Sequence, residues 1–189
     1  MAQIFVISDT HFGHANIQNF ILPNGERMRP FASVEEMDET MIERWNAVVS
    51  PSAHVYHLGD VAMHKSHVQT AKRLNGKKRL VRGNHDIYPT RTYLEAGFQE
   101  IYGVRVFDDM ILSHIPLHIE SLKTRWLANV HGHLHNNQPQ GHLGPRYYNV
   151  CVEMINYTPI SLEDLRVILR KQHEAWQDRQ AALEHGIFI

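Results

Sequence analysis

The chain has 189 residues, 43% of them hydrophobic, which is enough to form one domain over residues 1–189 with a substantial buried core. Its 19 Lys and Arg residues are balanced by 20 Asp and Glu residues, so the net charge of −1 provides no overall attraction to nucleic acid or to an anionic membrane. One cysteine, Cys151, excludes an internal disulfide framework, and no apolar run has the length of a membrane helix, so we expect a cytoplasmic protein without membrane contacts.

The N-terminal part of the chain predicts a strand, an irregular segment and a helix. An apolar, β-branched run at residues 3–7 predicts a buried strand. Residues 14–32 have little periodicity and contain the turn Pro23-Asn24-Gly25, so we expect them to form a lid over a site. Ser33 opens a capping-box pattern for a helix that should end near Ser50-Pro51.

The remaining elements follow from the same periodicities. We predict strands at residues 54–58, 79–82, 126–130 and 147–152, a hairpin within 99–113 that turns at Asp108-Asp109, and helices at 65–74 and after Ser161. The apolar side of the final helix carries Leu162, Leu165, Leu169 and Trp176, which we expect to be buried. Strands that alternate with helices and are followed by antiparallel pairs predict a mixed α/β fold.

Five short segments contain the residues that suggest chemistry, and each lies at or just after the end of a predicted strand. They are Asp9-Thr10-His11, Gly59-Asp60, Gly83-Asn84-His85-Asp86, His114 and Gly132-His133-Leu134-His135. Side chains that follow strand ends meet in the crevice beyond the carboxyl edge of a sheet. Oxygen and imidazole ligands that converge there fit a site for two divalent metal ions.

Each segment alone also has a purely structural explanation. Asp9 and Asp60 could cap helices, His114 could be an ordinary loop histidine, and Asn84-His85-Asp86 could form a turn. The combination favours the metal site, because all five segments occur in one order and all of them follow strands.

In this order the segments resemble the calcineurin-like metallophosphoesterase superfamily, whose pattern is D-x-H, G-D, G-N-H-D/E, H and G-H-x-H. The match covers about residues 3–152 and is closest to the small single-domain phosphoesterases of bacteria and phages. Gly59-Asp60 continues as Val61-Ala62-Met63 and not as the x-V-D-R-G of Ser/Thr protein phosphatases, which disfavours that activity. The resemblance implies two mixed β-sheets packed face to face, with helices outside.

The resemblance also implies how two metal ions are held. Asp9, His11, Asp60 and His135 should bind the first ion, and Asp60, Asn84, His114 and His133 the second, so that Asp60 bridges them. It implies that a hydroxide bridging the ions attacks phosphorus and that His85 protonates the leaving group. Mn²⁺ is the metal that the resemblance favours, and Fe²⁺, Ni²⁺ or Zn²⁺ also suit these ligands.

Three further residues are candidates for substrate contacts. His14 and His118 each lie within four residues of a proposed ligand, and Arg82 is adjacent to Gly83. Two divalent ions bring more charge than Asp9 and Asp60 neutralise, so we expect an anionic substrate. We expect small, nucleotide-derived phosphodiesters, with phosphomonoesters as the alternative, and the net charge disfavours long nucleic acid.

Two other interpretations stay open. A non-catalytic metal-binding scaffold of the same fold is the alternative from a different functional class, although every ligand type and His85 are present. The length of the final helix and the apolar residues Ile187-Phe188-Ile189 also leave a homodimer open.

Overall fold

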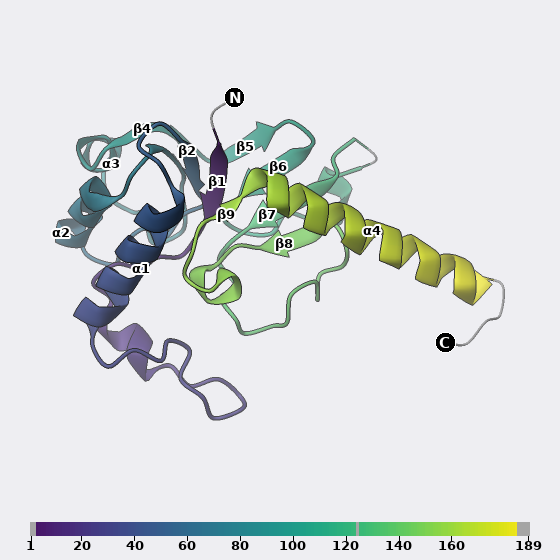
Figure 1. Cartoon of the computed structure of the whole chain (residues 1–189), viewed down its shortest axis with the longest axis horizontal. Helices are drawn as coiled ribbons and strands as arrows, with labels where there is room; N and C mark the ends of the chain where they lie inside the picture. Colours follow the sequence, from purple (N-terminus) through teal and green to yellow (C-terminus); the bar gives the residue numbers. More distant parts are fainter. Residues whose placement is uncertain (1–2, 124, 185–189) are drawn as a thin grey trace.

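The computed structural model describes residues 3–123 and 125–184, and it contains two β-sheets packed face to face (Figure 1). The first sheet has five strands in the order β4-β3-β2-β1-β9, and the second has four in the order β5-β6-β7-β8. Both sheets are mixed, since each combines parallel pairs with one antiparallel edge strand. The predicted α/β fold of two mixed sheets flanked by helices is confirmed.

Parallel strands in the first sheet end at a common level. Its strands are β1 (Ile4–Ile7), β2 (His54–His57), β3 (Lys77–Val81), β4 (Phe98–Tyr102) and the antiparallel β9 (Ile160–Ser161). Ile7 lies opposite His57, and His57 lies opposite Leu80. The loops that follow the first three strands therefore begin side by side.

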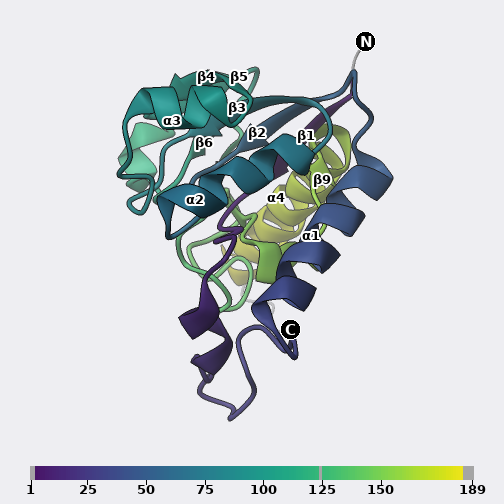
Figure 2. The ribbon, with the colours of Figure 1, turned by 90° about the vertical axis from the view of Figure 1, so that its left-hand side faces the viewer.

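Helices cover the outer face of this sheet (Figure 2). They are α1 (Val34–Val48), α2 (Lys65–Val68), which continues as the 3-10 helix η2 (Gln69–Arg73), and α3 (Thr90–Glu95). Met37, Met41 and Trp45 of α1 repeat every four residues and are buried in the core beneath it. As predicted, Ser33 caps α1, because its Oγ accepts a 3.1 Å hydrogen bond from the Glu36 N–H.

The second sheet brings two further strand ends to the same region. A hairpin of β5 (Val104–Phe107) and β6 (Met110–Ser113) turns at Asp108-Asp109, and β7 (Ala128–His131) and β8 (Tyr147–Asn149) follow in parallel. Leu122, which follows the 3-10 helix η3 (Ile119–Ser121), is buried against Ile111 and Tyr147 of this sheet. The 3-10 helix η4 (Val152–Ile155) follows β8.

The core between the sheets includes the start of the last helix, α4 (Leu162–Glu184). Leu162, Leu165 and Leu169 are buried there, and Ser161 caps the helix through a 3.0 Å hydrogen bond from the Asp164 N–H, both as predicted. The second half of α4 runs out beyond the sheets (Figure 1). Trp176 on this half is 43% exposed, so its predicted burial is wrong.

The segment at residues 14–32 is fixed at both ends. It holds the 3-10 helix η1 (Ala15–Asn19) and extends away from the sheets below α1 (Figures 1 and 2). Ile17, Met28 and Phe31 are buried in the core, whereas the turn at Pro23-Asn24-Gly25 is exposed. Only the middle of the predicted lid is therefore free to cover a site.

Several element predictions change in detail. Residues 98–113 form three strands and not two, because Gly103 separates β4, which joins the first sheet, from β5, which joins the second. Helix α3 escaped prediction because six residues are too few to show a periodicity. Ile187-Phe188-Ile189, named for a dimer contact, lie outside the described residues. Within residues 3–123 and 125–184, no helix has the length and apolarity needed to cross a membrane.

Candidate metal centre

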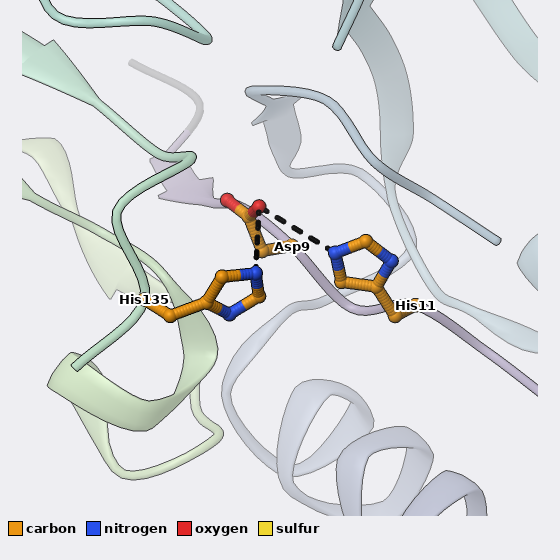
Figure 3. A group of neighbouring side chains, drawn as sticks. All are labelled: Asp9, His11 and His135. Carbon is orange, nitrogen blue, oxygen red and sulfur yellow. Dashed lines mark ion pairs between the residues drawn. The ribbon is translucent and has the colours of Figure 1, made fainter. Parts of the chain in front are cut away.

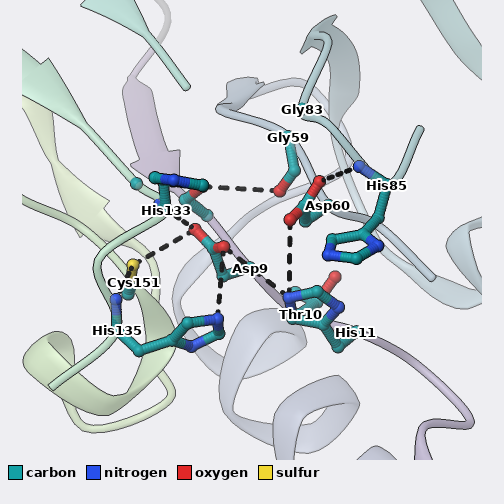
Figure 4. A network of polar contacts seen from close by, with 12 residues as sticks. Asp9, Thr10, His11, Gly59, Asp60, Gly83, His85, His133, His135 and Cys151 are labelled. Carbon is teal, nitrogen blue, oxygen red and sulfur yellow. Dashed lines mark hydrogen bonds and ion pairs between the residues drawn. The ribbon is translucent and has the colours of Figure 1, made fainter. Parts of the chain in front are cut away.

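The structure brings together all seven side chains that the sequence assigned to metal binding. Each follows the carboxyl end of a strand: two after β1, one each after β2, β3 and β6, and two after β7, namely Asp9, His11, Asp60, Asn84, His114, His133 and His135. They meet at the junction between the two sheets, because both sheets direct these strand ends to it. Figure 4 shows five of them, Asp9, His11, Asp60, His133 and His135.

The backbone at the site is held in an unfavourable conformation. Asp9, His11, Asp60, His133 and His135 have φ angles of 59°, 48°, 58°, 70° and 47°, in the left-handed region that side chains seldom adopt. Each such residue costs about 1–3 kcal/mol, and such strain gathers at functional sites. Nine non-glycine residues of the described chain have a positive φ, and five of them are predicted ligands, so this strain is concentrated at the junction.

A first set of donor atoms is formed by Asp9, His11 and His135 (Figure 3). Asp9 Oδ1 lies 3.7 Å from His11 Nε2 and 3.7 Å from His135 Nε2. Asp9 Oδ1 and His11 Nε2 are both buried without a hydrogen-bond partner. Buried polar atoms are seldom left in this way, and a divalent cation between them would satisfy both. These residues therefore fit a metal ion.

A second set is formed around Asn84. Its Oδ1 lies 2.8 Å from His114 Nε2 and 2.9 Å from His133 Nδ1. His114 Nδ1 lies 2.8 Å from the Leu58 carbonyl oxygen, which can only accept a hydrogen bond, so this nitrogen carries a proton and Nε2 is the nitrogen directed at the site. An amide oxygen with two imidazoles suits Mn²⁺, Fe²⁺, Ni²⁺ or Zn²⁺.

Asp60 lies between the two sets. Its Oδ2 is 3.6 Å from His11 Nε2 and 3.4 Å from His114 Nε2. The side chain is 3% exposed, so its charge acts in a medium of low dielectric constant. One buried carboxylate oxygen is therefore close to an imidazole nitrogen of each donor set.

The electrostatics favour positive charge at this point. Burial alone would raise the pKa of Asp9, but the nearby imidazoles of His11, His135 and His114 hold that pKa well below its usual range. Burial alone would lower the pKa of His114, but Asp60 and Asp9 raise it to about 9. The Asp9 carboxylate is thus stabilised as an anion, and the His114 imidazole beside it is stabilised as a cation. Negative charge at this point would also stabilise a bound metal ion.

Two residues outside the ligand set fix the loops after β1, β2 and β3. The Asp86 carboxylate accepts hydrogen bonds from the N–H groups of Asp60, Val61 and Gly83, at 2.8, 3.1 and 2.9 Å. His57 accepts from the Gly59 N–H at 3.2 Å through Nδ1 and lies 2.9 Å from Thr10 Oγ1 through Nε2. Burial lowers the pKa of His57 to about 3, so it is neutral.

Arg29 and Glu153 lie beneath the first donor set. Arg29 Nε donates to Glu153 Oε1 at 2.7 Å, and the same oxygen lies 3.1 Å from His135 Nδ1. Burial would raise the pKa of Glu153, but Arg29 and His135 lower it to about 2. Cys151 is buried as predicted, and burial raises the pKa of its thiol, which donates to Asp9 Oδ2 at 3.1 Å.

The predicted catalytic acid is at the mouth of the site. The imidazole of His85 is exposed, and its centroid is 5.5 Å from that of His11. Its backbone N–H donates to Asp60 Oδ1 at 2.8 Å (Figure 4). His85 therefore has a fixed backbone and a side chain that faces solvent beside both donor sets.

The structure separates the three predicted substrate residues. The His14 ring lies 5.7 Å from that of His11, and burial, followed by the charges of His11 and Arg29, lowers its pKa to about 4. Arg82 is held by the Tyr88 carbonyl oxygen at 2.8 Å but lines a groove with Asn84 and His114. His118 is exposed, accepts from the Glu120 N–H at 3.3 Å, and has no contact with a ligand in the described part of the chain. The prediction for His118 gains no support.

Sequence reasoning missed four residues that support the ligands. Asp86 was visible as part of the Gly83-Asn84-His85-Asp86 segment but was given no role. His57, Arg29 and Glu153 lie in no motif, and Glu153 is 124 residues from Arg29 along the chain. Only their buried contacts show what they do.

Comparison with known proteins identifies the family of this chain. The profile of the family described as calcineurin-like phosphoesterase matches residues 2–187, so the chain belongs to that family. It is 36% identical over 182 residues to the uncharacterized protein MJ1445 of Methanocaldococcus jannaschii, with 90% of this chain and 93% of that protein covered. The predicted family resemblance is thereby confirmed, and membership of this family supports a metal-dependent phosphoesterase.

Two solved structures resemble this chain to different degrees. The protein of unknown function AQ665 from Aquifex aeolicus superposes with a TM-score of 0.70 at 29% identity, over 89% of this chain and 100% of that one. The nuclease MPE of Pseudomonas putida superposes with a TM-score of 0.46 at 21% identity, over 70% of this chain and 61% of that one, which is too distant to bear on function.

Proposed function

We propose that this protein hydrolyses small phosphodiesters, nucleotide-derived molecules in particular, with two divalent metal ions as cofactors. The observation that carries the proposal is the position of Asp60, whose Oδ2 is within 3.6 Å of a nitrogen from each donor set. Two ions held by these sets would make water nucleophilic at neutral pH and stabilise negative charge on the phosphoryl oxygens. Mn²⁺ is the first metal to test.

Two imidazoles outside the ligand sets can act on the substrate. His85 is exposed beside the site and has no assigned metal, so it can donate a proton to the departing oxygen. The His14 ring also lies near the His11 ring, 5.7 Å away, and with a pKa of about 4 it is neutral near pH 7. It can therefore donate one hydrogen bond to a phosphate without adding charge.

A groove beside the second donor set supports a diester over a monoester. It has a volume of about 310 Å³ and begins at Asn84 and His114. The rest of its lining is mostly apolar and comes from both sheets, namely Arg82, Gly83, Gly103, Val104, Ser113, Ile115 and Leu117. A monoester has one organic substituent, which can leave past His85, whereas the groove offers room for the second substituent of a diester.

The experiment is a comparison of matched esters with Mn²⁺-loaded protein. We expect faster hydrolysis of bis(p-nitrophenyl) phosphate than of p-nitrophenyl phosphate, and loss of both activities in Asp60→Asn. Cyclic nucleotides, 5′-mononucleotides and short oligonucleotides then define the natural class. Metal binding without any turnover would favour the scaffold alternative, and a preference for monoesters would refute the diester assignment.

A further inference from the structure

A fully buried arginine lies beneath the metal centre. Arg29 is 0% exposed, although it comes from the irregular segment before α1. Its guanidinium donates to Glu153 Oε1 at 2.7 Å, to the Thr10 carbonyl oxygen at 2.8 Å and to the Asp9 carbonyl oxygen at 2.5 Å. Every nitrogen of the guanidinium thus has an oxygen acceptor. Two of these acceptors belong to the strained backbone that carries Asp9.

The partner of Arg29 fixes the chemistry of a predicted ligand. Glu153 Oε1 lies 3.1 Å from His135 Nδ1, and the Glu153 side chain is 1% exposed. Since a guanidinium can only donate, this carboxylate oxygen is an acceptor, and His135 Nδ1 must carry the proton between them. His135 Nε2, 3.7 Å from Asp9 Oδ1, then keeps its lone pair for the site.

We propose that Glu153 and Arg29 are positioning residues for the first metal ion. Glu153 holds His135 in the orientation and tautomer that offer Nε2, and Arg29 fixes both Glu153 and the Asp9 backbone. Carboxylates that bind the far nitrogen of a ligating histidine typically change metal affinity by 10- to 100-fold. The inference rests on the proposed metal-dependent function, because it concerns the same ions.

The same contacts argue against a direct ligand role for Glu153. His135, Cys151 and Glu153 lie close enough to form a metal-binding group of their own. However, the guanidinium 2.7 Å from Glu153 Oε1 already supplies a positive charge there and would repel another cation. Cys151 Sγ donates to Asp9 Oδ2 at 3.1 Å and accepts from the His135 N–H at 3.2 Å, so it is a protonated bridge between two ligands.

The role of the segment at residues 14–32 changes as a result. The sequence predicted a lid, but Arg29 anchors the end of this segment under Asp9 and Glu153. The C-terminal end of this segment therefore helps to hold the residues of the first donor set in place. The exposed turn at Pro23-Asn24-Gly25 is the part that stays free.

The test measures Mn²⁺ binding by calorimetry in two complementary backgrounds. The first background, Asn84→Ala with His133→Ala, removes ligands of the second donor set, so that its isotherm reports Mn²⁺ binding at the first set. The second background, His11→Ala with His135→Ala, removes ligands of the first donor set, so that its isotherm reports binding at the second set. In the first background we expect Glu153→Gln and Arg29→Met to raise the Kd for Mn²⁺ by about 10- to 100-fold. In the second background both should leave the Kd within about twofold.

Matched controls come from exposed residues of the same types. Arg27→Met changes an exposed arginine in the same segment as Arg29. Glu120→Gln changes an exposed glutamate away from the predicted ligands. We expect neither to change either Kd. Arg29→Lys keeps the buried cation and serves if Arg29→Met does not fold, and we expect it to weaken the first position less than tenfold.

Three outcomes would overturn the inference. Equal losses at both positions would indicate general structural support, and unchanged affinity at the first position would exclude positioning. Three bound ions in the wild type that fall to two in Glu153→Gln would make Glu153 a ligand. If the wild type binds no Mn²⁺, the proposed function itself fails, which is a separate result.

Discussion

The backbone N–H of His85 donates a 2.8 Å hydrogen bond to Oδ1 of Asp60, so the predicted acid and the predicted bridging ligand are joined through the main chain. The other carboxylate oxygen of Asp60 faces the imidazoles of His11 and His114. The main chain thus sets where the His85 imidazole lies relative to the metal centre, and the side chain keeps the freedom to meet a leaving group.

We predict that His85→Ala will slow hydrolysis of esters with poor leaving groups by about 10²–10⁴-fold, because it removes the imidazole proposed to protonate the departing oxygen. Hydrolysis of p-nitrophenyl esters should fall much less, since nitrophenolate departs unprotonated. Steady-state rates on a matched pair of alkyl and nitrophenyl diesters test this. His118→Ala, which changes an exposed histidine away from the ligands, should alter neither rate. Equal losses on both esters would contradict the role of His85 as acid.

The Asp86 carboxylate should be a major source of stability. It accepts three backbone hydrogen bonds from the loops after β2 and β3, and Asp86→Ala would leave those N–H groups buried and unsatisfied. At about 1–3 kcal/mol for each group, we expect the free energy of unfolding to fall by at least about 3 kcal/mol. Urea denaturation of the metal-free protein measures this. Asp86→Asn retains one acceptor oxygen and should lose less; a loss below about 1 kcal/mol in Asp86→Ala would show that these bonds are not needed.

Gly83 should be irreplaceable for a steric reason. A Cβ at Gly83 would lie 2.1 Å from Asp60 Oδ1, so Gly83→Ala must displace the bridging carboxylate. Gly103 is a matched control, because a Cβ there meets nothing within 4 Å. We expect Gly83→Ala to lose tight Mn²⁺ binding and Gly103→Ala to keep it, as measured by equilibrium dialysis. Retention of two bound ions by Gly83→Ala would show that Asp60 can move without loss.

Stability should fall in acid through His57. Burial lowers the pKa of His57 to about 3 in the folded protein, below its ordinary value of 6.5. Between these values the unfolded chain binds the proton and the folded chain does not, so the contribution is complete above about pH 6.5 and is lost as the pH falls toward 3. Between pH 6 and 4, we expect the free energy of unfolding of the wild type to fall by about 1.4 kcal/mol per pH unit relative to that of His57→Gln.

The comparison of the two urea-denaturation curves, taken at each pH, isolates His57. Other buried histidines, such as His131, whose pKa burial lowers to about 4, titrate equally in both proteins and cancel. Parallel stability curves for wild type and His57→Gln would mean that His57 is protonated in the folded protein.

The amino-acid sequence by itself determined the family and the mixed α/β fold, and it singled out the candidate ligands that the fold brings together. These could be read because each ligand directly follows a buried strand, and the carboxyl ends of parallel strands must meet. His11 and His135, for example, are far apart in sequence, but both follow strands that end at the same junction, and their ring centroids lie 5.2 Å apart.

Only the tertiary structure decided which residues hold those ligands in place and which sheet each strand joins. The chain passes from the first sheet to the second at Gly103. A strand has the same alternating residue pattern in either sheet, so the pattern cannot show which sheet it joins. Arg29 and Glu153 lie in no motif, because a buried ion pair needs only two side chains that meet in space. Trp176 follows the apolar stripe of α4, yet it is exposed because the helix extends beyond the sheets that would cover it. The local sequence pattern specifies which candidate ligands follow each strand. Burial and long-range contacts decide which other residues hold those ligands in place.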